Sequence, residues 1–484
     1  PNRQARAGPM RIAAIRAIIA ATAFFAPAAS PCAAAQLPFK PGAGQGVFLH
    51  VSDLHFYPFA DQTIVRRLIA APIEQWAAIF RSSRDTPFWD KSKDTTFPLL
   101  AATLAAAKGP AYDYVLSTGD MLAHDFKDEF LKAGGAESEY AGFVAKTMRF
   151  VDRMIEQSFP GIPLIATLGN NDSTCGDYRL APSDPMLAPV GRGIPYLARH
   201  PQALRDFTMG GSYVVAHPKV PNHDMVVLSD VFWSRNYQDA CAKSGGDPGS
   251  AELAFLEWTL YQAKLAGRTV SLVMHIPPGI DSYKARRNVC PVEVTGFWQD
   301  AYAQRFATLV ARYKDQLRLG FAGHTHMDDF RLMTDADGAP LLATRVTPAV
   351  SPLFGNNPAF TVMLYSRTDA SVVDYATFYL ANLAKAGADV APAWKLEYTF
   401  KAAYAVPGYD AATLAALAKR IRTDDAVRAS FMAYYAVESG NSAMKASNWN
   451  VFACAQTAIT PDAYRSCVCP GAAPDRGPAN APPR

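Results

Sequence analysis

The segment Tyr114-Val115-Leu116-Ser117-Thr118-Gly119-Asp120 indicates the fold class of this chain. It joins a short apolar strand, Tyr114–Leu116, to a turn that ends in a glycine and a carboxylate. The glycine permits a tight backbone turn that a bulkier residue would crowd. In open α/β sheets, ligands bind beyond the carboxyl ends of the strands, so Asp120 stands where a ligand-binding residue is expected.

The same arrangement recurs along the chain. We predict further strands at Val47–Val51, Leu164–Ala166, Met225–Leu228, Thr269–Met274 and Leu317–Ala322. Segments with a helical period of apolar residues lie between them, at Pro98–Ala107, Ser138–Gln157, Glu252–Leu265 and Phe297–Tyr313. This alternation predicts an α/β fold.

Five of the predicted strands are followed by residues that bind metals. The motifs are Ser52-Asp53-Leu54-His55, Gly119-Asp120 with His124 four residues on, Gly169-Asn170-Asn171-Asp172, His275-Ile276-Pro277-Pro278-Gly279, and Gly323-His324-Thr325-His326. Imidazole and carboxylate ligands suit zinc, iron or manganese, and the lack of cysteine disfavours a purely structural zinc site. One carboxylate can give an oxygen to each of two ions, and we expect Asp120 to do so. Each motif alone is common by chance, but all five together predict a centre for two divalent metal ions.

The composition sets limits on the function. The chain has 484 residues, 50% of them hydrophobic, and this is enough to form a large core. The net charge of +4 does not indicate a protein that binds nucleic-acid duplexes.

The N-terminus is typical of a secretory signal peptide. Arg11 and Arg16 follow Met10, and an apolar run, Ala17–Ala26, precedes the small residues Ala33-Ala34-Ala35. We therefore expect residues 1–35 to be a leader with its upstream residues, and the protein to be secreted or periplasmic. No later apolar run is long enough to span a membrane.

Six cysteines remain after the leader, and an even number in an exported protein favours disulfides. They are Cys175, Cys241, Cys290, Cys454, Cys467 and Cys469. The 15 possible pairings stay open. The Cys-x-Cys step at the end of this set could also bind a metal, but without a matching second pair we expect bridging.

The composition changes after about residue 373. We expect a main domain over 36–373 and a C-terminal part over 374–469, with helices at Ala411–Ile421 and Ala426–Tyr435. The Pro, Ala and Gly-rich stretch 470–484 is predicted to be disordered.

The motifs, in this order, resemble the calcineurin-like metallophosphoesterases. A closer resemblance is to acid sphingomyelinase and its phosphodiesterase relatives. It rests on Gly119-Asp120-Met121-Leu122-Ala123-His124-Asp125, Phe255-Leu256-Glu257, His275-Ile276-Pro277-Pro278-Gly279, Gly355-Asn356-Asn357-Pro358-Ala359-Phe360 and Trp394-Lys395-Leu396-Glu397-Tyr398-Thr399-Phe400. The likeness extends from about Val47 to Cys469.

This resemblance implies a fold, an activity and a role for each site residue. The implied fold is α/β, a sandwich of two mixed sheets flanked by helices, with a helical C-terminal subdomain and the site at one edge. The implied activity is hydrolysis of phosphodiester bonds by a water that two metal ions activate, with zinc expected and iron or manganese as alternatives. The first ion would be held by Asp53, His55, Asp120 and His326, and the second by Asp120, Asn170, His275 and His324. His124 would face the substrate phosphate.

Two departures from the family affect the expected substrate. Only a short segment separates the predicted leader from the first strand, so no saposin-like lipid module is expected there, and sphingomyelin is in doubt. Asn171 stands where the family has a histidine that meets the phosphate and can protonate the leaving group. The resulting G-N-N-D resembles the endopolyphosphatases, and an amide cannot supply a proton near neutral pH.

Three functions therefore remain open. The first is a phosphodiesterase acting on a phosphorylated small molecule or a lipid head group. The second is a hydrolase of polyphosphate or nucleotide anhydrides, which Asn171 favours and the basic loop with Lys284, Arg286 and Arg287 weakly supports. The third, a non-catalytic metal-binding protein, is disfavoured because every expected ligand is present.

Overall fold

The computed structural model describes residues 36–471, apart from positions 84–85, 90–92, 242–245, 288, 291 and 388. The predicted leader, 1–35, and nearly all of the tail predicted to be disordered lie outside the described residues. The description below concerns the unit that contains residues 36–471.

The described strands form two six-stranded sheets. The first sheet has the order β12-β11-β10-β1-β2-β3, with β1 (Gln45–Val51), β2 (Val115–Ser117), β3 (Leu164–Ala166), β10 (Ala359–Ser366), β11 (Val372–Leu380) and β12 (Trp394–Thr399). The second has the order β4-β5-β6-β7-β9-β8, with β4 (Tyr213–Ala216), β5 (His223–Val227), β6 (Thr269–Val273), β7 (Leu317–Ala322), β8 (Asp329–Thr334) and β9 (Pro340–Val346).

Both sheets are mixed, with parallel strands where the metal-binding motifs occur. Strands β1, β2 and β3 are parallel, with Val51 opposite Ser117 and Ser117 opposite Ala166, whereas β10 to β12 continue antiparallel. In the second sheet β5, β6, β7 and β9 are parallel, and β4 and β8 are antiparallel to their neighbours. The carboxyl ends of parallel neighbours meet at one edge of a sheet, which brings the motifs after them together.

The two sheets pack face to face. Phe48 of β1 meets Phe321 of β7 edge to face, with ring centroids 5.6 Å apart, and both side chains are buried. At the neighbouring edges, the hydroxyl of Tyr213 on β4 accepts a hydrogen bond from the Ala166 amide of β3 and donates one to its carbonyl oxygen. The predicted α/β sandwich of two mixed sheets is confirmed.

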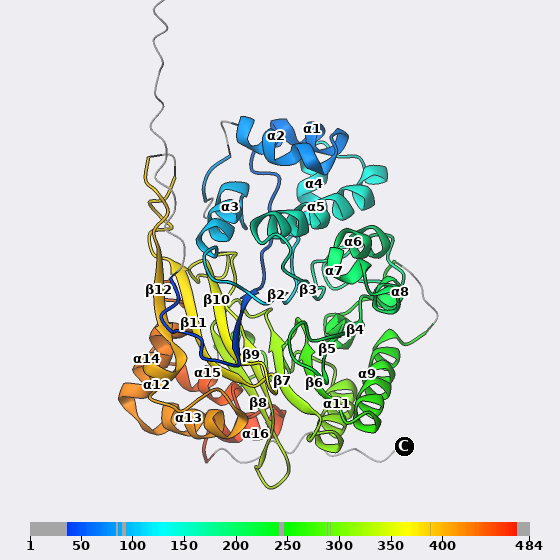
Figure 1. Cartoon of the computed structure of the whole chain (residues 1–484). Coiled ribbons are helices and arrows are strands. Elements are labelled where there is room, and N and C mark those ends of the chain that lie inside the picture. Colours follow the sequence, from blue (N-terminus) through cyan, green and yellow to red (C-terminus); the bar gives the residue numbers. More distant parts are fainter. Residues whose placement is uncertain are drawn as a thin grey trace, which may run out of the picture. The chain divides into compact units, whose positions relative to one another are not determined.

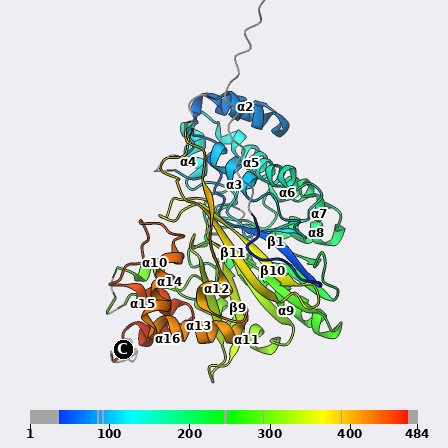
Figure 2. The same cartoon turned by 60° about the vertical axis from the view of Figure 1, so that its left-hand side comes forward.

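Helices cover both ends of this sandwich. Those before and between the strands are α1 (Val65–Ala70), α2 (Trp76–Ser82), α3 (Phe97–Ala106), α4 (Phe126–Lys132), α5 (Glu137–Ser158), α6 (Leu187–Gly193), α7 (Pro195–Ala198), α8 (Pro201–Gly210), α9 (Pro248–Leu265), α10 (Ser282–Ala285) and α11 (Asp300–Arg312), with the 3₁₀ turns η1 (Gln62–Ile64), η2 (Ile73–Gln75) and η3 (Asp230–Trp233). In Figures 1 and 2, α1, α2, α4 and α5 lie at the opposite end of the sheets from the C-terminal helices.

The C-terminal part continues the first sheet and then becomes helical. After β11 and β12 the chain forms α12 (Phe400–Tyr404), α13 (Ala411–Thr423), α14 (Asp425–Tyr435), α15 (Trp449–Ala455) and α16 (Pro461–Val468). The predicted helical character of this part is confirmed. Residue 373, where we predict a domain boundary, lies within β11, and the boundary itself stays a prediction.

Asp328 connects the loop after β7 to β9 and to the C-terminal part. Arg345 donates to Asp328 at 2.6 Å, and neither side chain is more than 3% exposed. Thr377 of β11 donates to the other oxygen of Asp328, and the Asp328 amide donates to the Tyr435 carbonyl of α14. The segment that follows His326 is thereby fixed from three elements.

The six described cysteines form three disulfides, as predicted. The pairs are Cys175–Cys241, Cys290–Cys469 and Cys454–Cys467. The two cysteines of the Cys-x-Cys step therefore bond to different partners. Among residues 36–471 as described, no helix has the length and apolar character that crossing a membrane requires.

Candidate metal centre

Five loops from both sheets bring the predicted site residues together. Asp53 and His55 follow β1, Asp120 and His124 follow β2, Asn170 and Asn171 follow β3, His275 follows β6, and His324 and His326 follow β7. Contacts among their side chains connect all nine. The nine residues thus form one cluster.

The first group of donor atoms lies between the β1 and β7 loops. Nε2 of His55 is 3.1 Å from Nε2 of His326 and 3.7 Å from Oδ1 of Asp53. The same Asp53 oxygen is 3.4 Å from Nε2 of His326. Asp53, His55 and Asp120 each offer an atom to a group in which all atoms lie within 4.8 Å of one another.

The second group lies toward β3 and β6. Nε2 of His275 is 3.0 Å from Oδ1 of Asn170 and 3.3 Å from Nδ1 of His324. Asp120, His275 and His324 form another group whose donor atoms lie within 4.8 Å of one another. These are the residue types and the close convergence that a divalent transition metal requires.

Asp120 connects the two groups. Its Oδ2 atom is 3.4 Å from Nε2 of His55 and 3.3 Å from Nε2 of His275. A carboxylate between two clusters of donors is placed to contribute to both, so the donor set fits two neighbouring divalent cations.

Backbone carbonyls set the tautomers of two imidazoles. Nδ1 of His55 donates to the Leu122 carbonyl at 2.9 Å, and Nδ1 of His275 donates to the Thr118 carbonyl at 2.7 Å. When Nδ1 carries the proton, Nε2 is left with its lone pair toward the cluster. Such partners orient metal-binding histidines and make them more basic.

The loops hold their ligands in an unusual backbone conformation. Positive φ angles occur at Asp53 (49°), His55 (40°), Asp120 (54°), His324 (68°) and His326 (63°). Residues other than glycine pay of order 1–3 kcal/mol for such conformations, which cluster at functional sites. This strain is consistent with loops shaped for binding.

Two glycines make room for the carboxylates. A Cβ atom at Gly169 would lie 2.0 Å from Oδ1 of Asp120, and one at Gly323 would lie 2.4 Å from Oδ2 of Asp53. Any side chain at these two positions would displace a predicted metal ligand.

Burial and charge shift the pKa values of the imidazoles in opposite directions. Burial lowers the pKa values of His324 and His326 to about 3. At His55 and His275 burial acts in the same direction, but the surrounding carboxylates, with Asp120 the strongest, together outweigh it and raise the pKa values to about 9 and about 10. A cation that binds here takes the place of those protons.

Two buried carboxylates that sequence reasoning did not single out as site residues hold the loops in place. Asp172 accepts hydrogen bonds from the amides of Met121 and Leu122, and burial, with the charge of Asp120, raises its pKa to about 6. Asp230 accepts from the amides of His275 and Ile276 at 2.9 Å. Burial raises the pKa of Asp230 to about 7.

A third carboxylate, Asp94, positions His124. Asp94 accepts from the backbone amide of His124 at 2.8 Å and from its Nδ1 atom at 3.0 Å. Ser351 donates to the other Asp94 oxygen at 2.6 Å. The ring of His124 also stacks on that of His55, with centroids 4.1 Å apart. No pattern around Asp94 marks it in the sequence, so only the fold could identify it.

Asn171 contacts the Asp120 carboxylate. The backbone N–H of Asn171 donates to Oδ1 of Asp120 at 2.8 Å, and its side-chain Nδ2 donates to Oδ2 at 2.9 Å. Both atoms of the Asp120 carboxylate are thus oriented by one residue of the G-N-N-D motif.

Two cavities border the cluster. The larger, of about 710 Å³, has His124 and Asn171 in its wall, with Lys127, Arg179 and Arg235 among its charged residues. The smaller, of about 180 Å³, reaches His324 and is lined by aromatic side chains. These are Tyr178, Tyr283, Phe297, Phe354, Tyr435 and Phe452.

Comparison with known proteins identifies the family of the chain. Residues 46–328 match the calcineurin-like phosphoesterase family, and residues 339–473 match the acid sphingomyelin phosphodiesterase C-terminal region. The chain is 27% identical to the acid sphingomyelinase-like phosphodiesterase 3b of Homo sapiens, over 87% of this chain and 90% of that protein. It is 26% identical to the cyclic GMP-AMP phosphodiesterase of Mus musculus, over 81% of this chain and 83% of that protein.

A solved dimetal phosphatase from Danio rerio aligns with 72% of this chain and 98% of its own, at 11% identity and a TM-score of 0.38.

The family match covers more than half of the chain and spans the five loops that carry the cluster. The chain therefore belongs to the calcineurin-like phosphoesterase family, as a hydrolase whose phosphoesterase domain is followed by an acid sphingomyelin phosphodiesterase C-terminal region.

Proposed function

We propose that the protein is an exported phosphodiesterase that works with two divalent metal ions. The observation that carries the proposal is the position of Asp120 Oδ2, 3.4 Å from His55 Nε2 and 3.3 Å from His275 Nε2. In this proposal Asp53, His55, Asp120 and His326 hold one ion, and Asp120, Asn170, His275 and His324 hold the other. The ions supply a polarised water as the nucleophile and neutralise charge on the phosphoryl group. The mixed imidazole and carboxylate set favours zinc, with iron or manganese as alternatives.

The protein's own residues orient the substrate and supply the proton. Asp94 contacts the Nδ1 atom of His124, so Nε2 is the nitrogen that would meet the substrate. One ring nitrogen of His124 also lies within 4.8 Å of donor atoms of His55 and His326, so the histidine stands at the edge of the first donor group. An alcohol leaving group needs a proton as its bond breaks, and general acid catalysis typically contributes about 10²–10⁴-fold. We assign that role to His124. Asn171, with its amide on Asp120, cannot share it, because an amide has no proton to give near neutral pH.

The two cavities support a diester as the substrate. A phosphodiester has two organic arms, and the cluster has a polar cavity against His124 and an aromatic one against His324. Tyr178 and Asn236 line both cavities, so the two spaces adjoin. The names of the relatives, a sphingomyelinase-like phosphodiesterase and a cyclic GMP-AMP phosphodiesterase, support the same reaction class. A phosphorylated small molecule or a lipid head group would fit these spaces.

The disulfides support export. Three bonds that join segments 66, 179 and 13 residues apart would not persist in a reducing cytosol. A secreted or periplasmic location agrees with the leader expected at the N-terminus.

Asn171 favours a second candidate function, hydrolysis of polyphosphate or nucleotide anhydrides. A phosphate leaves an anhydride with little need of an acid. The lack of a histidine at position 171 would therefore not slow the hydrolysis of an anhydride. The basic loop gives this candidate little further support, since Lys284 is 3.4 Å from Asp281 and the Arg286 guanidinium lies over the Tyr283 ring.

Rates on a panel of substrates decide between the two candidates. The panel contains bis(4-nitrophenyl) phosphate, 4-nitrophenyl phosphate, an alkyl phosphodiester, ADP and polyphosphate, each assayed with the metal-loaded protein. We expect the highest kcat/KM on the diesters. Faster turnover of polyphosphate or ADP would select the anhydride hydrolase, and no turnover of any member would favour a metal-binding protein without catalysis.

A further inference from the structure

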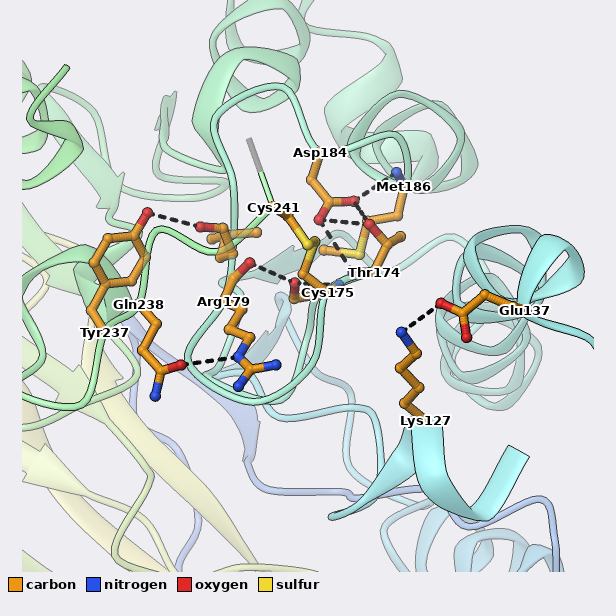
Figure 3. Close-up of a disulfide and its surroundings, with 12 residues drawn as sticks. Lys127, Glu137, Thr174, Cys175, Arg179, Asp184, Met186, Tyr237, Gln238 and Cys241 are labelled. Carbon is orange, nitrogen blue, oxygen red and sulfur yellow. Dashed lines mark hydrogen bonds and ion pairs between the residues drawn. A yellow bond between two sulfur atoms is a disulfide. The ribbon is translucent and has the colours of Figure 1, made fainter. Parts of the chain in front are cut away.

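A disulfide holds the loop that follows the G-N-N-D motif, which we name the clamped loop (residues 173–179). Cys175 in this loop is bonded to Cys241, at a Cα–Cα distance of 6.0 Å. Beside the disulfide, the backbone N–H of Gln238 donates to the backbone carbonyl of Tyr178 at 2.9 Å. Figure 3 shows the disulfide, and below it Arg179 and Gln238 hydrogen-bonded across the same two segments. The clamped loop is therefore joined to residues 238–241 by the disulfide and by two hydrogen bonds.

The clamped loop contacts the cluster through Asp177, which meets Asn170, and through Tyr178, whose hydroxyl lies 3.5 Å from Nε2 of His324. Oδ1 of Asp177 accepts a hydrogen bond from Nδ2 of Asn170 at 2.7 Å. The opposite end of that amide, Oδ1 of Asn170, lies 3.0 Å from Nε2 of His275. A backbone bond from the Tyr178 amide to the Asn170 carbonyl, 2.8 Å long, keeps the two segments in register.

This contact decides which end of the Asn170 side chain faces the cluster. The oxygen and nitrogen ends of an amide have nearly the same shape, so packing alone does not distinguish them. An ionised carboxylate only accepts hydrogen bonds, so Asp177 attracts the NH₂ end. The oxygen then points toward His275, and oxygen is the only end of the amide that can bind a cation.

We propose that Asp177 is a positioning residue for the second metal ion, acting through Asn170, and that the Cys175–Cys241 disulfide keeps Asp177 in place. This inference rests on the proposed function, in which Asn170 is a ligand of that ion. It assigns the disulfide a role in metal affinity in addition to stability. Partners of this kind typically change metal affinity by about 10–100-fold when they are removed.

The test measures binding of Zn²⁺ to the intact, metal-stripped protein by calorimetry, with the bound ions counted by elemental analysis. Asp177→Ala should weaken the second binding step about 10–100-fold and leave the first unchanged. Asp177→Asn should restore the affinity only in part, since its amide can turn either its oxygen or its NH₂ group toward Asn170 and no longer selects one end. The paired change Cys175→Ser and Cys241→Ser should weaken the same step.

A double-mutant cycle tests whether Asp177 acts through Asn170. In an Asn170→Ala background, Asp177→Ala should have no further effect on the second step, because its only proposed target is gone. Equal losses in both backgrounds would overturn the inference, as would wild-type affinity in Asp177→Ala. Cys454→Ser with Cys467→Ser removes a disulfide elsewhere and should leave both steps unchanged.

The inference and the proposed function fail in different ways. If the wild-type protein binds fewer than two ions, the two-metal proposal is wrong, and the Asp177 role falls with it. If the wild type binds two ions and the Asp177 variants bind them equally well, only the role of Asp177 is wrong. Circular dichroism of each variant establishes that a weaker second step does not come from unfolding.

Discussion

Asp94 accepts hydrogen bonds from both the backbone amide and the ring Nδ1 of His124, at 2.8 and 3.0 Å, and lies 30 residues before it in the chain. Asp94 is 3% exposed, and the hydroxyl of Ser351 donates to its second oxygen. Burial alone raises the pKa of a carboxyl group, but the neighbouring His55 and His124 hold the pKa of Asp94 below its usual range. A buried, ionised carboxylate thus fixes the orientation of the imidazole that we assign as the proton donor.

Asp94→Asn should therefore slow substrates according to their leaving groups. The variant retains a side chain of the same shape but loses the charged acceptor for Nδ1–H. For an alkyl phosphodiester we expect kcat to fall by about 10² or more, within the range of general acid catalysis. For bis(4-nitrophenyl) phosphate we expect less than about a tenfold loss, because nitrophenolate leaves without an acid.

His124→Ala is expected to give the same pattern with a larger loss, and Ser351→Ala a smaller one. The measurement is a rate series over diesters of graded leaving-group pKa, in wild type and each variant. If the wild-type and His124→Ala series run parallel, His124 binds the phosphate and is not the acid. The anhydride function that Asn171 favours would then gain support.

Asp120→Asn should remove most activity and lower the metal content. The oxygen of a neutral amide carries no net negative charge, so it would be a poor bridge between two cations. Elemental analysis should give about two ions per wild-type chain and close to one in the variant. Asp410→Asn is the matched control, because it makes the same exchange at the N-cap of α13, where asparagine caps a helix about as well as aspartate. Its activity and metal content should equal those of wild type. Near-normal turnover in Asp120→Asn would contradict the two-metal proposal.

Local patterns in the sequence were sufficient to predict the loops that carry the cluster. Each motif follows an apolar strand, and β3 and β7 have the predicted bounds, Leu164–Ala166 and Leu317–Ala322. The hydrophobic period and the turn residues are properties of short segments, so both can be recognised without knowledge of the fold. The order of the motifs, on which the family resemblance rests, predicts the same loops.

The parts that were missed depend on contacts between distant segments. Asp94 has no motif around it, and Asp230 meets the His275 amide 45 residues later in the chain. Strands β4, β8, β9 and β10 were not predicted. The register of β10 against β1, with Leu49 opposite Val362, joins residues more than 300 positions apart. The disulfide pairing also stayed open, because it is decided by which cysteines the fold brings together.

The disulfides should differ in their effect on stability. Cys290–Cys469 spans 179 residues, and Cys454–Cys467 spans 13. Cross-links restrict the unfolded chain more when they close longer loops, so the free energies lost on removal should differ by about 2 kcal/mol. We expect chemical unfolding of the alanine double variants to show the larger loss for Cys290→Ala with Cys469→Ala.

Thiol titration of the exported protein, denatured without reductant, should accompany that measurement. We expect none of the six described cysteines to react. Six titratable thiols would show that the bonds do not form in the compartment where the protein folds.

Glu252 in α9 should make the stability of the protein depend on pH. Its side chain is buried and accepts hydrogen bonds from the Ser212 hydroxyl at 2.7 Å and the Ser229 amide at 3.1 Å. Burial raises its pKa to about 7, whereas an unfolded glutamate titrates near 4.3. The folded state therefore holds a proton that the unfolded state releases between these values. The stability from this group is fully present below about pH 4 and is lost as the pH rises through 7, by up to about 4 kcal/mol.

Glu252→Gln should remove this dependence. The amide stays neutral at every pH and can still accept from Ser212, so its Tm should fall less between about pH 5 and pH 8 than that of wild type. Glu257→Gln is the matched control on the same helix, because Glu257 is partly exposed and paired with Arg312, where screening keeps the contribution small. The measurement is Tm by circular dichroism across this range. Wild type and Glu252→Gln profiles that run parallel would mean that Glu252 stays ionised in the folded protein, and that the two hydrogen bonds compensate for its burial.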